Sequence, residues 1–264
     1  MPYAETISGR IYYEEHGRGQ PLVFIHPPGM GRVVFQKQIS LSSQFRVILP
    51  DLSGHGDSPA VRGAVTIEKY RREILNLLDE LSISKAIICG YSAGGTIAQS
   101  LAIQHPARVK ALILSGGYPS TENIGLRMEH EIGEHLVNHF RRPLAKGLAA
   151  AHTKEKNFRR ELAAHMHKAD ARVWREYYHA AQHYDCRKAL VAITCPVLLL
   201  YGAKSDVINK HLRIYKKSLK YKQIGIFKDV NHQLPTKKWN EFNQMIAGFL
   251  TQYQKTETND ILIH

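Results

Sequence analysis

The chain has 264 residues, 44% of them hydrophobic and 22% charged, with a formal net charge of +13 at pH 7. This length accommodates one α/β domain with an insertion, and the composition is that of a soluble globular protein. No apolar run approaches the roughly 18 residues that cross a bilayer, which argues against integral membrane association.

The excess of basic residues is spread along the chain and is densest over residues 211–222. No nucleic-acid-binding module accompanies it, so we expect no nucleic-acid partner. A solvated basic surface explains the charge, and an anionic substrate or a membrane-surface role are the alternatives. Three cysteines without metal-like spacing indicate reduced thiols. Because the first residues also lack the features of a signal peptide, we expect a cytoplasmic protein.

The first elements predict an antiparallel start to a sheet. Residues 3–7 and 10–15 flank Ser8-Gly9 and have the pattern of a β-hairpin. Short, continuous apolar runs then recur, which is typical of strands buried on both faces of a parallel sheet. These runs are residues 22–25, 46–49, 86–89, 111–114, 197–201 and 221–227.

Helices are predicted between most of these runs. Residues 66–81 begin at a capping Thr66 and carry apolar residues at helical spacing, and residues 93–105 stop before Pro106. Residues 239–250 form an amphipathic C-terminal helix, and the mostly polar tail from Gln252 is expected to fray.

The segment Gly90-Tyr91-Ser92-Ala93-Gly94 carries the strongest chemical signal. It follows a buried strand and precedes a helix with small residues on its first turn. A serine on a sharp strand-to-helix turn is a nucleophile elbow, in which bulk two residues before or after the serine would clash. The pattern predicts that Ser92 is a nucleophile.

An acid and a base follow in the order that this nucleophile requires. Asp206 lies in the loop after the strand over 197–201, and His232 lies in the loop after the strand over 221–227. Asp229 competes with Asp206 as the acid, although its place on the histidine's own loop favours a structural role. Capping of the next helix is the alternative for Asp206.

These segments together resemble the α/β-hydrolase fold superfamily over roughly residues 9–250. Glu15–His26 is similar to the family's opening hairpin and third strand, and Asp51–Ser58 to its Asp-x-x-Gly-x-Gly-x-Ser turn. The resemblance implies a mostly parallel central sheet with an antiparallel N-terminal hairpin, helices on both faces and a helical cap insertion. We expect the core to comprise residues 1–118 and 190–264, and the cap to comprise the strand-free residues 119–189.

The resemblance also implies acyl-ester chemistry with no metal or organic cofactor. Ser92, His232 and Asp206 would form the triad, and the oxyanion hole would use the N–H of Ala93 and one from the loop after His26. That loop departs from the family pattern, because Pro28 occupies the usual donor position and has no N–H. Either Gly29 donates instead, or the hole is weak. The His26–Pro27 and Pro27–Pro28 bonds are candidates for the cis form.

The expected substrate is a small or medium acyl compound bearing an ester, lactone or thioester, bound by a monomer or homodimer. His26, Tyr91, Trp174 and Tyr178 are candidate substrate-binding residues, although cap-to-core packing explains Trp174 and Tyr178 equally well. The rival functions are C–C bond hydrolysis of the ring-cleavage type and slow-turnover ligand binding or signalling. The helical pairs His135/His139 and His179/His183 are weak candidates for a metal site.

Overall fold

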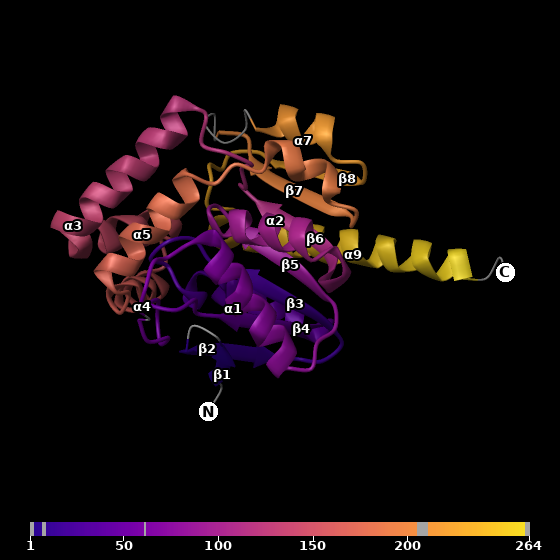
Figure 1. The fold of residues 1–264 in the computed structure, drawn as a ribbon, viewed down its shortest axis with the longest axis horizontal. Coiled ribbons are helices and arrows are strands. Elements are labelled where there is room, and N and C mark those ends of the chain that lie inside the picture. The colour runs from indigo at the N-terminus through magenta and orange to yellow at the C-terminus, as the bar shows by residue number, and fades with distance from the viewer. Residues whose placement is uncertain (1–2, 7–8, 61, 205–210, 262–264) are drawn as a thin grey trace.

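The fold is an eight-stranded mixed sheet with helices on both faces, seen in a computed structural model that describes residues 3–6, 9–60, 62–204 and 211–261 (Figure 1). The strand order is β1-β2-β4-β3-β5-β6-β7-β8. β1 pairs antiparallel with β2, and β2 with β4, whereas every pair from β4-β3 to β7-β8 is parallel. The strands are β1 Tyr3–Thr6, β2 Gly9–His16, β3 Gln20–Ile25, β4 Phe45–Pro50, β5 Ala86–Tyr91, β6 Val109–Ser115, β7 Val197–Gly202 and β8 Lys222–Phe227. The predicted fold class is therefore confirmed.

The buried apolar side chains of the strands divide between two hydrophobic clusters, one on each face of the sheet. On β3, Val23 and Ile25 belong to the cluster that also contains α1 and α2 residues, while Leu22 and Phe24 belong to the cluster with η1 and α9. This alternation follows from the two-residue period of a strand. Because both faces are buried, the strands read as continuous apolar runs in the sequence.

The core helices begin and end at residues with a clear local cause. The side chain of Thr66 caps α1 by accepting a hydrogen bond from the Lys69 N–H at 3.0 Å. α2 ends before Pro106, which cannot continue a helix. The core elements are η1 Arg32–Ser43, α1 Ile67–Glu80, α2 Gly94–Gln104, η2 Pro106–Arg108, η3 Arg187–Ala192, α7 Leu212–Ser218, α8 Leu234–Lys237 and α9 Trp239–Ile261.

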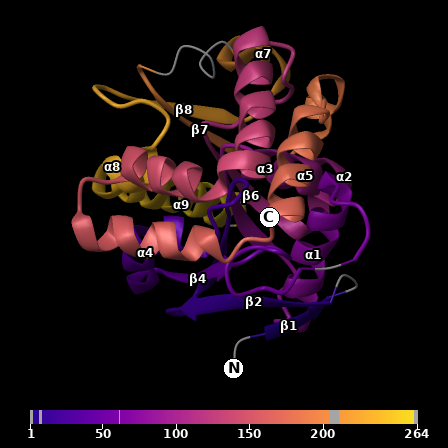
Figure 2. The ribbon, with the colours of Figure 1, turned by 90° about the vertical axis from the view of Figure 1, so that its left-hand side faces the viewer.

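A helical insertion separates β6 from β7 and lies beyond one end of the sheet (Figures 1 and 2). This insertion, which we call the cap, contains α3 Ile124–His152, α4 Lys156–His167 and α5 Ala171–Gln182, and α3 packs against both other helices. α3 is interrupted at Phe140, where φ is −137°, three residues before Pro143. Since a proline inside a helix removes one hydrogen bond and clashes with the preceding turn, Pro143 accounts for the break.

Two features of the core differ from the expectations. The C-terminal helix α9 continues past Leu250 to Ile261 and projects from the body of the protein (Figure 1). Its polar extension contains neither Pro nor Gly, so nothing local ends it. The 3-10 segment η1 was not predicted. In the described part of the chain, no helix combines the length and apolar character that a membrane span requires.

Candidate active site

Ser92 sits on a strained turn between β5 and α2. Its φ is +53°, which is unusual for a residue with a side chain, and its N–H donates to the Ser115 carbonyl at 2.8 Å. A Cβ at Gly90 would lie 2.6 Å from the Gly95 Cα, and one at Gly94 would lie 2.2 Å from the Ile25 carbonyl oxygen. Both glycines are therefore needed for the turn to form, as the elbow motif predicts.

Ala93 follows Ser92 at the N-terminal end of α2, and the two residues line a common cavity, which is described below. The first N–H groups of a helix have no acceptor within the helix, and the helix dipole adds positive potential there. The Ala93 N–H thus lies beside the nucleophile in a region suited to binding an oxyanion.

His232 reaches the same place from the loop between β8 and α8. Its ring packs on Gly116, which directly follows β6: a Cβ at Gly116 would lie 2.4 Å from both Nδ1 and Cε1 of the imidazole. The ring also lies near that of Tyr91, with ring centroids 5.1 Å apart. Since Tyr91 precedes Ser92 and Gly116 follows the carbonyl that binds the Ser92 N–H, these contacts place His232 beside the nucleophile.

Burial governs the protonation of His232. Burial, together with the nearby His152 and His130, lowers the pKa of His232 to about 4. The imidazole is accordingly neutral near pH 7 and able to accept a proton. Its buried Nδ1 has no hydrogen-bond partner among the residues that the structure describes.

The predicted acid, Asp206, lies outside the described residues. The chain that leads to it runs beside the histidine loop, because the N–H groups of Ala203 and Lys204 donate to the carbonyls of Phe227 and Val230. The competing carboxylate, Asp229, has a side chain that is 81% exposed and lies 3.4 Å from the Lys204 ammonium. Asp229 therefore faces solvent rather than the imidazole.

The loop after His26 forms a tight turn. The Met30 N–H donates to the Pro27 carbonyl at 3.3 Å, and Gly29 has a φ of +78°. These features match a type II turn, which favours Pro at its second position and Gly at its third. The cis form considered for the two X-Pro bonds is wrong, since both are trans. Pro28 lines the cavity without an N–H, and the Met30 N–H is used within the turn.

The cap helix α5 holds this turn in place. A Cβ at Gly29 would lie 2.0 Å from the Trp174 ring, so the indole packs directly on the glycine. The Tyr177 hydroxyl donates to the His26 carbonyl at 3.1 Å. Trp174 is fully buried and is not among the residues that line the cavity. The structure thus favours cap-to-core packing over substrate contact for Trp174.

His26 also lies behind the cavity wall, in contrast to its predicted contact with substrate. Its Nε2 accepts from the Leu52 N–H at 3.0 Å, and its Nδ1 lies 2.9 Å from the Pro27 carbonyl, to which it donates. Burial lowers the pKa of His26 to about 4, consistent with this neutral form. Both nitrogens are occupied by backbone groups, so His26 shapes the loop.

A cavity of about 330 Å³ lies between the elbow, the proline turn and the cap. The predicted residues Pro28, Tyr91, Ser92, Ala93, Tyr178 and His232 line it, whereas His26, Gly29 and Trp174 do not. Its other walls are mostly apolar and come largely from α3, and they comprise Pro27, Met30, Leu126, Glu129, His130, Ile132, Gly133, Leu136, Leu144, Leu148, His152 and Gln233.

Four polar residues of this wall were not predicted from the sequence, namely Glu129, His130, His152 and Gln233. The Nε2 atom of His152 lies 3.0 Å from the Tyr91 hydroxyl, and that of His130 lies 2.7 Å from the Tyr118 hydroxyl. Each Nδ1 donates to the carbonyl four residues earlier on α3, which leaves Nε2 as the acceptor. For Glu129 and His130, only the helical face shared with Leu126 and Gly133 could have indicated their position.

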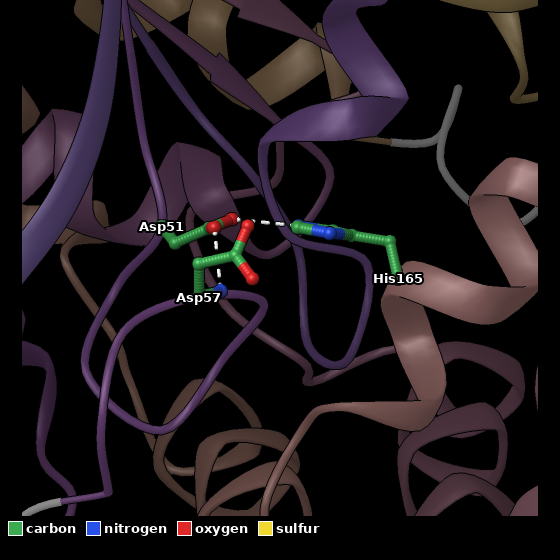
Figure 3. A group of neighbouring side chains, drawn as sticks. All are labelled: Asp51, Asp57 and His165. Carbon is green, nitrogen blue, oxygen red and sulfur yellow. Dashed lines mark hydrogen bonds and ion pairs between the residues drawn. The ribbon is translucent and has the colours of Figure 1, made fainter.

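A separate cluster joins Asp51, Asp57 and His165, and it is the one group of three possible metal ligands found among the described residues (Figure 3). Arg32 already supplies its positive charge: its guanidinium bonds to Asp51 and lies 2.8 Å from Asp57, and its Nε lies 2.7 Å from Glu14.

The cluster fastens the cap to the core. His165 on α4 lies 3.0 Å from Asp51, and Lys168 lies 2.6 Å from Asp57. Burial alone would raise the pKa of Asp51, but the bond with His165 and the charge of Arg32 hold that pKa well below its usual range. We therefore interpret the cluster as an ion-pair latch. The rings of the pairs His135/His139 and His179/His183 lie 4.7 and 4.2 Å apart in tilted arrangements. Neither pair belongs to a group of three possible metal ligands among the described residues.

Comparisons with known proteins agree with this architecture. Residues 20–235 match the family model described as alpha/beta hydrolase fold. The chain is 31% identical over 138 residues to a putative carbamate hydrolase, RutD, of Azorhizobium caulinodans, covering 52% of each chain. The alignment thus spans about half the length of that relative. The chain is also 26% identical over 263 residues to 3-oxoadipate enol-lactonase 1 of Acinetobacter baylyi, covering 95% of each.

A solved structure extends the comparison to the whole fold. An esterase from Exiguobacterium antarcticum superposes with a TM-score of 0.86 at 20% identity, covering 95% of this chain and 99% of that one. At this identity the likeness concerns the fold alone.

Proposed function

Since the chain belongs to the α/β-hydrolase fold family, we propose that it is a cofactor-independent serine hydrolase of ester-type bonds, namely esters, lactones or thioesters. One observation carries this proposal: Ser92, at a φ of +53°, and His232, packed on Gly116, line one cavity. A serine hydroxyl is a weak nucleophile until a positioned base takes its proton, and this arrangement supplies both groups.

In the proposed mechanism, Ser92 Oγ attacks the substrate carbonyl while His232 Nε2 accepts the hydroxyl proton. His232 then protonates the leaving group and activates water for deacylation. The Ala93 N–H binds the developing oxyanion, and Gly29, which lies in the adjacent turn but does not itself line the cavity, is the candidate for the second donor. We assign to Asp206 the role of the acid, which bonds to Nδ1, fixes the imidazole tautomer and stabilises the imidazolium.

The cavity supports a small or medium acyl group. Its volume of about 330 Å³ lies near the lower end of ligand sites, and side chains such as Met30, Leu136 and Leu148 give it an apolar wall. Among the described lining residues there is no Lys or Arg to pair with a substrate carboxylate. We place the activity in the cytoplasm, in a monomer or homodimer.

Turnover of p-nitrophenyl esters of increasing acyl length tests the proposal. We expect hydrolysis of the short and medium esters, and loss of that hydrolysis in Ser92→Ala with little change in the melting temperature. A C–C hydrolase using the same triad would instead cleave a ring-cleavage dienoate and leave the esters nearly untouched. A binding protein would hydrolyse neither, and either result would reject the ester assignment.

A further inference from the structure

The cavity beside Ser92 carries a negative charge inside a strongly basic protein. Glu129 is the one acidic residue among its described lining residues. Burial lowers the pKa of His152 and of His232 to about 4, and it lowers the pKa of His130. All three imidazoles are therefore neutral near pH 7, and they do not balance the carboxylate.

Glu129 lies on the face of α3 that forms the cavity wall. Leu126, His130 and Gly133 share this face. Gly133 allows α5 to approach, because a Cβ there would lie 2.9 Å from the Tyr178 ring. Burial raises the pKa of Tyr178 to about 12, and the charge of Glu129 contributes to that rise. The carboxylate thus acts electrostatically on the part of the cavity that Tyr178 lines.

No cation neutralises Glu129 within the part of the chain that the structure describes. Two other acids of α3 have partners on α5: Glu131 accepts from the Gln182 amide at 3.1 Å, and Glu134 lies 3.5 Å from His179. Desolvation raises the pKa of Glu129 without an opposing basic group. An unpaired carboxylate at a binding cavity favours neutral or cationic ligands over anionic ligands.

We propose that Glu129 is a charge filter, so that the substrate's acyl group is neutral or cationic and acyl groups bearing a carboxylate are rejected. This inference rests on the proposed ester hydrolysis at Ser92. The net charge of +13 attracts anions to the protein as a whole, and Glu129 reverses that preference locally. For an exposed charge several ångströms from a bound carboxylate, we expect discrimination of about five- to tenfold.

The test compares three p-nitrophenyl esters of similar length: the hexanoate, the monoadipate and the 5-(trimethylammonio)pentanoate. In Glu129→Gln, we expect the kcat/KM ratio of monoadipate to hexanoate to rise about five- to tenfold, and the ratio of cationic ester to hexanoate to fall. Glu131→Gln, on the same helix but outside the cavity wall, is the matched control and should leave both ratios as in the wild type. Raising the salt concentration should bring the two wild-type kcat/KM ratios closer to those of Glu129→Gln.

A binding measurement separates this inference from the proposed function. Calorimetry gives the Kd of hexanamide and of adipamate, its ω-carboxylate analogue, for Ser92→Ala with and without Glu129→Gln. The filter predicts that adipamate binds more weakly than hexanamide, and that Glu129→Gln reduces this difference in Kd. If the esters are not hydrolysed but Glu129→Gln reduces the difference in Kd, the proposed function is wrong and the charge filter is supported. Unchanged ratios in both assays overturn the filter.

Discussion

The imidazole of His232 rests directly on Gly116, where a Cβ would lie 2.4 Å from both Nδ1 and Cε1. Gly116 also has a φ of +58° and follows Ser115, whose carbonyl accepts the Ser92 N–H. The end of β6 thus positions both the nucleophile and the base.

Substitution Gly116→Ala should displace the imidazole and lower kcat by roughly 10²-fold, because a shift of about 1 Å is enough to misalign a catalytic group. Steady-state kinetics on a p-nitrophenyl ester measures this effect. Gly63→Ala is the matched control: Gly63 has a φ of +86° with nothing within 4 Å, so it introduces the backbone strain without the clash. Equal kcat values for the two variants would show that the contact does not position the base.

The proposed acid is tested by the titration of His232. Burial and neighbouring imidazoles lower its pKa to about 4, and a carboxylate at Nδ1 would raise it. Hydrolysis requires neutral His232, so the activity falls as the pH drops through the pKa of His232. We expect Asp206→Asn to lower kcat by roughly 10⁴-fold and to shift the imidazole titration to lower pH. An NMR titration of the histidine side chains reads the shift.

Asp229→Asn provides the comparison for the acid. Because the Asp229 side chain is 81% exposed and pairs with Lys204, its removal should alter kcat and the His232 titration little. The opposite pattern, with the large loss in Asp229→Asn, would reassign the acid.

If the oxyanion hole needs an N–H donor at position 28, Pro28 lowers the rate of catalysis. Pro28→Gly and Pro28→Ala both restore an N–H at this cavity-lining position, and we expect kcat on a simple ester to rise by up to roughly 10²-fold. The glycine variant should gain less, since it loosens the turn. Pro27→Ala controls for loss of proline from the same loop. A lower kcat in both Pro28 variants would mean that the prolines shape a competent hole through Gly29.

The ion-pair latch should be a major source of stability. Asp51→Asn leaves Arg32 with fewer partners in a buried site, and we expect a loss of about 3–5 kcal/mol in the free energy of unfolding at neutral pH. The depressed pKa of Asp51 means that its contribution is complete above the unfolded value near 4 and declines as the pH falls through the folded value. The difference between wild type and variant should therefore shrink in acid.

Denaturant unfolding of Glu68→Gln is the control for the latch. Its partners are Arg72, one turn later on α1, and Arg71 at 3.8 Å. The side chains of Glu68 and Arg72 are exposed, so the loss should stay within about 0.5 kcal/mol. Equal losses in Asp51→Asn and Glu68→Gln would contradict the latch.

Local patterns in the sequence were sufficient to predict the sheet, the elbow and the placement of His232. Continuous apolar runs identify buried strands, and the glycines around Ser92 record a backbone conformation that excludes side chains. The latch between Arg32, Asp51 and His165 could not be predicted in this way, because its members are far apart in the chain and meet only when the cap docks. Glu129 resembles any exposed helical acid until the orientation of α3 is known.

The assignment of Ser92 is tested most directly by a fluorophosphonate probe followed by peptide mass spectrometry. The proposed mechanism predicts one covalent adduct per chain, on Ser92, and no adduct in a folded Ser92→Ala variant. Absence of labelling in the folded wild type, or labelling that persists in Ser92→Ala, would contradict an activated nucleophile at this elbow.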